Sequence, residues 1–149
     1  AGGASRAVLH ALLERGFETV HLANRTIGRA EELADRFGQK VKAHTLEAMN
    51  EIAPEMDLVV NTTSLGMEGD GDIPLDLMLL RPDALVTDIV YVPLITPLLQ
   101  RASNRGLRIA AGLGMLLHQA APGFEKWFGV RPLVTETLRE LVIADMEKH

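Results

Sequence analysis

Residues 1–5 form a run of small residues, Ala-Gly-Gly-Ala-Ser, and a helical apolar pattern comes directly after them. A phosphate-binding turn of the form G-x-G-x-x-G/A needs glycine at its sharp bend and again where the backbone approaches a pyrophosphate. Gly2 fits the second glycine position and Ser5 the third small position, so the first glycine and its strand would precede Ala1. The run alone could be an ordinary loop, and the prediction of a nucleotide site depends on the residues after it.

Those residues show the pattern of a helix that packs on a sheet. The apolar positions fall at i, i+3, i+4, i+7 and i+8, namely Ala4, Ala7, Val8, Ala11 and Leu12. The start of such a helix directs unpaired N–H groups and the positive end of its dipole at a bound phosphate, and Arg6 lies in its first turn. Together the run and the helix predict an anion site.

Further along, short apolar runs alternate with helical patterns. The predicted strands are 19–23, a short strand at Val41, 57–61, 84–88 and 107–110, and the predicted helices are 28–37, 45–53, 75–80, 97–105, 115–128 and 134–148. This alternation is typical of a parallel sheet with right-handed crossovers. We expect one α/β domain over residues 1–149, a Rossmann-like doubly wound parallel sheet with helices on both faces and two C-terminal helices.

Composition excludes several classes of function. The formal charge of −5 and the lack of Lys/Arg runs argue against nucleic-acid binding. The absence of cysteine excludes disulfides and Cys-ligated metals, and no apolar run is long enough to span a membrane. We expect a soluble cytoplasmic protein, monomeric or homodimeric, with no metal and no membrane partner.

Ligands of an open parallel sheet bind beyond the carboxyl ends of its strands. The polar stretch 24–29 lies at such an end, where an NAD site usually places an acid for the ribose hydroxyls and an NADP site needs cations for the extra phosphate. Here Asn24 takes the position of the acid, and Arg25, Thr26 and Arg29 come after it, with Thr26 placed to cap the next helix. This stretch predicts NADP as the cofactor.

Several further runs of the chain form a specific set of motifs. With the stretches above, the set is residues 1–7, 24–26, 29–34, 61–67 (Asn-Thr-Thr-Ser-Leu-Gly-Met), 88–91 (Asp-Ile-Val-Tyr), 96–98 and 112–116 (Gly-Leu-Gly-Met-Leu) with Gln119. Together these runs resemble shikimate dehydrogenase. The resemblance covers nearly the whole chain, in order and spacing. It implies an NADP-dependent reduction of 3-dehydroshikimate to shikimate in aromatic amino-acid (chorismate) biosynthesis.

The resemblance also assigns roles to residues. The cofactor-binding set that it implies is Ala1, Gly2, Gly3, Ala4, Ser5, Asn24, Arg25, Thr26, Arg29, Thr63, Ile89 and Gly112, with Gly112 against the nicotinamide. Tyr91 and Gln119 would contact the shikimate or 3-dehydroshikimate substrate. From the residues alone, we would interpret Tyr91 as a packing residue and Gln119 as a surface amide.

Two departures from the family pattern affect these roles. Ala111 stands where the family often has Asp. The catalytic Lys and Asp of the family belong to an N-terminal substrate domain that this sequence does not contain, so we expect no catalytic residue here and an inactive isolated chain. The alternatives are a quinate/shikimate dehydrogenase, another NADP-dependent reductase domain such as that of glutamyl-tRNA reductase, or a non-catalytic nucleotide-binding module.

Other charged and apolar positions predict structure rather than chemistry. Glu68, Asp70 and Asp72 alternate with glycines and are more typical of a solvated loop than of a metal site, and Asp88 is better placed to form a turn than to act as an acid. The last helix carries an apolar face, formed by Leu138, Leu141, Val142 and Met146. We expect that face to pack against the N-terminal substrate domain.

Overall fold

The computed structural model describes residues 2–67, 71–146 and 148 of the chain. The chain passes between two units. Unit 1 comprises Ala1–Asp57 and Ile73–Ala84, and unit 2 comprises Leu58–Asp72 and Leu85–His149. None of the described helices is long and apolar enough to cross a bilayer.

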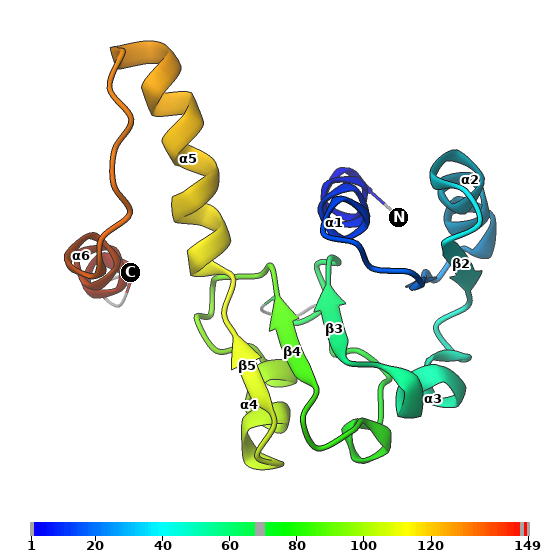
Figure 1. Cartoon of the computed structure of the whole chain (residues 1–149). Helices are drawn as coiled ribbons and strands as arrows, with labels where there is room; N and C mark the ends of the chain where they lie inside the picture. The colour runs from blue at the N-terminus through cyan, green and yellow to red at the C-terminus, as the bar shows by residue number, and fades with distance from the viewer. Residues whose placement is uncertain (1, 68–70, 147, 149) are drawn as a thin grey trace. The chain divides into compact units, whose positions relative to one another are not determined.

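Unit 1 is built on two parallel strands, β1 (Val20–Ala23) and β2 (Val41–His44), which pair from Val20 with Val41 to Ala23 with His44. Helices α1 (Gly3–Glu14) and α2 (Ile27–Phe37) supply the rest of its core (Figure 1). One cluster of buried residues between these strands and helices consists of Leu9, Leu22, Ala30, Leu33 and Val41. Short helical turns, α3 (Met49–Ile52), η1 (Ala53–Glu55) and η2 (Leu77–Leu79), complete the unit.

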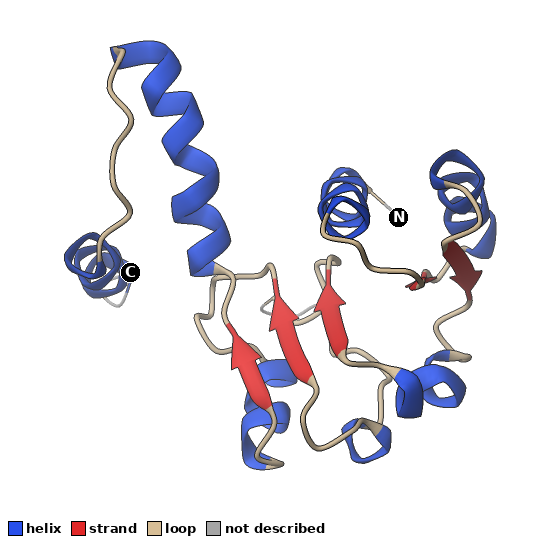
Figure 2. Ribbon diagram, viewed as in Figure 1, coloured by secondary structure: helices blue, strands red, loops and turns tan. Residues whose placement is uncertain are grey.

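Unit 2 contains a parallel sheet in the order β3–β4–β5, formed by β3 (Leu58–Asn61), β4 (Leu85–Asp88) and β5 (Arg108–Ala110). Figure 2 shows its three arrows running in the same direction. The register places Leu58 beside Leu85 and Asn61 beside Asp88, so both of these strands end at the same edge. Helix α4 (Pro97–Asn104) contacts β4 and β5 and buries Leu98, Leu99 and Ala102.

Two helices come after β5 in unit 2. Helix α5 (Leu113–Phe128) leaves the sheet with only Leu113 and Ala121 buried, and no described residue of α6 (Glu136–Met146) is buried. The aromatic side chains of Phe124, Trp127 and Phe128 are exposed, with 81% of Trp127 accessible. This C-terminal pair therefore presents a large apolar surface within its unit.

The predicted α/β class, with parallel strands, flanking helices and two C-terminal helices, is confirmed. The hydrogen bonds nevertheless join the described strands into a pair and a triplet rather than one ladder. Two predicted helices are shorter in the structure. In place of the predicted helix 45–53, the chain forms α3 and then the η1 turn, which contains Pro54. In place of the predicted helix 75–80, it forms the single turn η2.

The predicted apolar stripe of α1 is only partly correct, because Ala4, Val8 and Leu12 are only partly buried. Ala7 and Ala11 are exposed, whereas Leu9 is buried and Leu13 packs against the same core. The larger leucine side chains remove more apolar area from water than alanines do, so they determine which face is buried.

Candidate functional site

The glycine turn of unit 1 has space around it. Gly2 lies just before α1, and its N–H donates to Oγ of the buried Ser5 over 3.4 Å. A Cβ added to Gly2 or Gly3 would meet no heavy atom within 4 Å, and neither glycine has a positive φ. Packing and backbone conformation therefore do not require these glycines, and the free space fits the close approach of a ligand. Ala1 lies outside the described residues.

In the polar stretch 24–29 after β1, Asn24 is held by hydrogen bonds and the two arginines are exposed. The Asn24 N–H donates to the carbonyl of His44 over 3.1 Å, and Asn24 Nδ2 donates to the carbonyl of Thr26 over 2.8 Å. Arg25 and Arg29 are exposed, and neither forms an ion pair within the part of the chain that the structure describes. Two guanidinium groups are thus available to an anion at this strand end.

The capping prediction for Thr26 is correct in position and wrong in chemistry. Thr26 is the N-cap of α2, but its side chain accepts no capping hydrogen bond. The first N–H groups of α2 therefore lack the hydroxyl partner that such a residue often provides. They lie beside Arg25 in sequence, at the positive end of the helix dipole.

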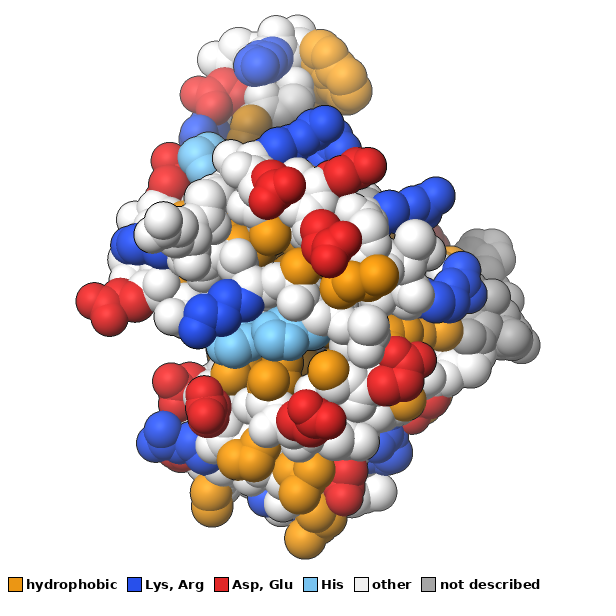
Figure 3. Space-filling view, turned by 90° about the vertical axis from the view of Figure 1, so that its right-hand side faces the viewer, with side chains coloured by type: hydrophobic (Ala, Val, Ile, Leu, Met, Phe, Trp, Pro, Cys, Tyr) orange, Lys and Arg blue, Asp and Glu red, His pale blue; other side chains and the backbone are white. Residues whose placement is uncertain are grey.

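Two histidines of unit 1 form a pair across β1 and β2. His21 Nδ1 and His44 Nε2 lie 2.8 Å apart, and the rings are stacked with centroids 4.9 Å apart. Burial lowers the pKa of His21 from its usual 6.5, His44 and Lys42 lower it further, and Glu55 opposes them. Figure 3 shows histidine side chains gathered on one face of the protein. Asn24 donates to the backbone of His44, so the pair adjoins the predicted phosphate stretch.

In unit 2, a buried carboxylate lies where β3 and β4 end. Asp88 Oδ1 accepts hydrogen bonds from Asn61 Nδ2 and from the Val90 N–H, both over 3.0 Å, and Oδ2 accepts one from Thr96 Oγ1 over 2.8 Å. Asp88, Asn61 and Thr96 are each at most 2% exposed. The bond from the Val90 N–H confirms that Asp88 forms a turn.

The loop after β3 is ordered by Asn61 and Thr63. Asn61 Oδ1 accepts from the Thr63 N–H over 2.9 Å and from Thr63 Oγ1 over 2.7 Å, while Asn61 Nδ2 also donates to the Leu65 carbonyl over 2.8 Å. The Leu65 N–H donates to Thr63 Oγ1 over 3.1 Å. The hydroxyl of Thr63 is therefore engaged inside the loop as both donor and acceptor.

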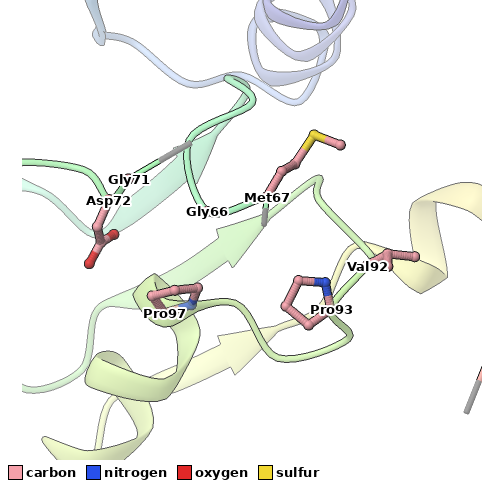
Figure 4. A pocket seen from close by; sticks show the side chains of 7 residues that line it. All are labelled: Gly66, Met67, Gly71, Asp72, Val92, Pro93 and Pro97. Carbon is pink, nitrogen blue, oxygen red and sulfur yellow. The ribbon is translucent and has the colours of Figure 1, made fainter. Parts of the chain in front are cut away.

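Two shallow hollows adjoin these loops. One, of about 480 Å³, is lined by Thr62, Thr63, Ser64, Met67, Ile89, Val90, Tyr91 and Val92. The other, of about 500 Å³, is lined by Gly66, Met67, Gly71, Asp72, Val92, Pro93 and Pro97, which come from the loop after β3 and the segment after β4 (Figure 4). The first hollow thus brings together three predicted site residues, Thr63, Ile89 and Tyr91.

Gly112 lies against the backbone of the loop that carries Tyr91. A Cβ at Gly112 would be 2.5 Å from the Ile89 carbonyl oxygen and 2.6 Å from that of Val90. This close approach gives Gly112 a structural reason to be glycine, besides the nicotinamide contact expected from sequence. Gln119 is exposed on α5 and does not line either hollow.

The acidic loop residues fall partly outside the described ranges. Glu68 and Asp70 are not described, and Asp72 pairs with Arg101 over 2.8 Å. No group of three or more potential metal ligands occurs among the described residues.

Comparisons with known proteins agree with this arrangement. The family model for shikimate / quinate 5-dehydrogenase matches residues 1–67, and the one for the shikimate 5'-dehydrogenase C-terminal domain matches residues 112–142. Over these two stretches, the chain is similar to the shikimate/quinate dehydrogenase family. The NADP(+) shikimate dehydrogenase of Rhizobium meliloti is 60% identical over the whole chain, and that of Rhizobium etli is 61% identical. The chain spans 52% of the length of each of those relatives.

Solved structures of the family show the same fold. Quinate dehydrogenase from Corynebacterium glutamicum, in complex with NAD, has a TM-score of 0.86 and 31% identity over 97% of this chain and 52% of its own. Shikimate 5-dehydrogenase from Thermus thermophilus, in complex with NADP(H) and shikimate, has a TM-score of 0.75 and 41% identity over 89% of this chain and 48% of its own. These Rossmann-like neighbours confirm the predicted fold class.

Sequence reasoning missed the connections among Asn61, Asp88 and Thr96. The polar ends of β3 and β4 and the Thr-Pro start of α4 were visible signals, but none of them shows which side chains meet. The predicted site residues fall into two sets, Gly2–Arg29 in unit 1 and Thr63–Gln119 in unit 2. Thr63 follows β3 and Tyr91 follows β4, whereas Gln119 lies within α5.

Proposed function

We propose that this chain is the cofactor-binding domain of an NADP-dependent shikimate dehydrogenase, which reduces 3-dehydroshikimate to shikimate. The observation that carries the proposal is the stretch after β1, where Asn24 replaces the usual acid and the exposed Arg25 and Arg29 flank the start of α2. The NADP(+) shikimate dehydrogenases that are about 60% identical to it support the same choice of cofactor.

The residues of unit 1 would hold the phosphates. The space beside Gly2 and Gly3 fits the pyrophosphate, and the start of α1, at the positive end of the helix dipole, would complete that site. Asn24, Arg25, Thr26 and Arg29 would bind the adenosine phosphate, with the guanidinium groups as charge-assisted donors.

The residues of unit 2 would bind the nicotinamide end of the cofactor and the substrate. Thr63 and Ile89 would line the nicotinamide side, Gly112 would support it, and Tyr91 and Gln119 would donate hydrogen bonds to hydroxyls of the substrate. When bound, NADPH supplies the hydride, and reduction of a ketone also requires a proton donor at its oxygen. We assign that donor to the substrate domain of the longer protein, with no catalytic acid or base in these 149 residues.

The exposed apolar side chains in and near the C-terminal helices are evidence for an interface with a second domain. Trp127 and Leu133 are each 81% exposed, and Leu141 on α6 is 65% exposed. A surface patch of this kind usually marks an interaction site. We propose that the substrate domain, in the part of the relatives that this chain does not span, covers it.

The decisive experiment measures NADP reduction by the full-length parent protein with shikimate and quinate offered separately and NAD as the alternative cofactor. Turnover with shikimate and NADP supports the proposal. Turnover with quinate and NAD would move the function to a quinate dehydrogenase, which the neighbour from Corynebacterium glutamicum favours as the second candidate. Tight NADPH binding without turnover of either alcohol would indicate a nucleotide-binding module or another reductase.

Arg25→Ala tests the cofactor argument separately. A hydrogen bond to a charged group contributes about 1.5 to 3 kcal/mol, so the variant should bind NADP about ten- to a hundredfold more weakly and NAD unchanged. Titration with the reduced cofactors, NADPH and NADH, followed by their fluorescence, measures both affinities. Arg36→Ala, an exposed arginine at the opposite end of α2, is the matched control and should bind both cofactors like the parent. Equal weakening of NADP and NAD by Arg25→Ala would contradict the assignment.

A further inference from the structure

Three segments of unit 2 meet at one buried carboxylate. Asp88 ends β4, Asn61 ends β3, and Thr96 is the N-cap of α4. Each of the other two donates a side-chain hydrogen bond to Asp88, and the Val90 N–H donates a third. A carboxylate that is 1% exposed is expensive to bury unless donors surround it, so all three segments must keep their places for Asp88 to be satisfied.

The same bonds reach the residues that line the hollow. Asn61 uses its amide nitrogen for Asp88 and its oxygen for Thr63, so the position of Thr63 depends on the carboxylate through one intermediate side chain. On the other side, the Val90 N–H bond fixes the backbone between Ile89 and Tyr91. Asp88, Asn61 and Thr96 do not themselves line either hollow.

The glycine of the β3 loop lies close to this cluster. Gly66 has a φ of +99°, and a Cβ placed on it would lie 3.5 Å from Thr96 Cβ and 3.6 Å from Asp88 Oδ2. The β3 loop thus approaches Asp88 and Thr96 through Gly66 as well as through Asn61. These contacts connect the two loops and the start of α4 independently of any ligand.

We propose that Asp88 is a positioning residue, whose buried carboxylate sets the loops after β3 and β4 relative to each other and so places Thr63, Ile89 and Tyr91 for the nicotinamide and the substrate. The assignment rests on the proposed function for its effect on catalysis. Its structural part, the coupling of the two loops through Asp88 and Thr96, stands independently of the reaction.

The test compares Thr96→Val with Thr96→Ser in the full-length parent protein. Valine keeps the shape of threonine and removes the hydroxyl that donates to Asp88, whereas serine keeps the hydroxyl. Loss of a hydrogen bond to a charged group corresponds to about a ten- to hundredfold change in an equilibrium. We expect amide hydrogen exchange in both loops, residues 62–67 and 89–95, to accelerate at least about tenfold in Thr96→Val. We also expect KM for shikimate and Kd for NADP to rise by about tenfold or more.

Thr135→Val controls for the loss of a helix cap. Thr135 Oγ1 accepts from the Leu138 N–H near the start of α6, as Thr96 Oγ1 accepts from the Leu99 N–H in α4. The control should leave loop exchange and kinetics unchanged. Asp88→Asn, which keeps the size of the side chain and removes its charge, is the second variant and should accelerate exchange in the same two loops.

Unchanged loop exchange and unchanged KM in Thr96→Val would overturn the proposal, as would a Thr96→Ser variant impaired as much as Thr96→Val. If the parent turns over neither shikimate nor quinate, the proposed function fails. Hydrogen exchange then still decides whether Asp88 and Thr96 couple the loops, so the two failures are distinguishable.

Discussion

Among the glycines of the described residues, Gly112 has the closest backbone neighbours. A side chain there would lie 2.5 Å from the Ile89 carbonyl oxygen, so Gly112→Ala must displace either α5 or the loop of Ile89 and Val90. Overpacking of this kind costs about 1–3 kcal/mol. We expect the variant to lower the free energy of unfolding by about that amount, as measured by urea denaturation of the full-length parent.

Gly123→Ala provides the comparison for Gly112→Ala. Gly123 lies inside α5, and a Cβ there meets no heavy atom within 4 Å. Alanine is favoured over glycine in a helix interior by about 0.5–1 kcal/mol, so this variant should be neutral or more stable. Equal destabilisation by both substitutions would mean that the approach to Ile89 and Val90 does not limit Gly112.

At the scale of single residues, the sequence indicates which chemical groups are present but does not indicate what those groups contact. Gly112, Thr63 and Tyr91 were predicted as site residues, but the reason for glycine at 112 depends on a backbone 22 residues away in the chain, that of Val90. Thr63 was expected to line the cofactor crevice, and its hydroxyl is bonded within its own loop. Residue type reveals which groups are available, whereas packing decides how they are used.

At the scale of elements, the paired histidines of β1 and β2 make the stability of unit 1 depend on pH. His21 has a pKa below 6.5 in the folded chain, so the unfolded chain takes up a proton first as the pH falls. The contribution of neutral His21 is present above pH 6.5 and is lost as the pH falls through the lowered pKa. Lys42 and His44 face His21 from β2, and Glu55 of η1 opposes their effect.

We therefore expect the free energy of unfolding to decrease from pH 7 towards pH 5, and His21→Gln to make this decrease shallower. Urea denaturation at several pH values, monitored by circular dichroism, measures the slope. His118→Gln, at an exposed position on α5 in unit 2, is the control and should retain the slope of the parent. An identical slope in His21→Gln and the parent would exclude His21 as its source.

The elements also show which structural features local sequence patterns can predict and which they cannot. Apolar runs predicted β1, β3, β4 and β5, whereas β2 was predicted from Val41 alone. The bond between Asn61 and Asp88 joins residues 27 positions apart and depends on the register of β3 against β4, which no local pattern specifies. In α1, the regular spacing of the alanines predicted one helix face as buried. The structure instead buries Leu9 and packs Leu13 against the same core.

At the scale of the whole molecule, several large apolar side chains in and between the C-terminal helices are exposed. Phe128 and Val130 are 65% and 66% exposed, and they lie close in sequence to Trp127 and Leu133, each 81% exposed. Burial of apolar area contributes about 25 cal/mol per Å², so association that covers such side chains is favourable. If the rest of the parent protein covers these side chains, the isolated chain should bury them by self-association.

We expect the 149-residue chain to self-associate with increasing concentration in sedimentation velocity, and Trp127→Lys combined with Leu133→Lys to suppress this. Met78→Lys, at a residue of unit 1 that is 71% exposed, adds a lysine at another apolar position and should leave association unchanged. In the full-length parent, fluorescence assigned to Trp127 by difference from Trp127→Phe should shift to shorter wavelength than in the isolated chain, because the indole leaves water. A monodisperse monomer at all concentrations, with Trp127 equally exposed in both proteins, would show that no domain covers this surface.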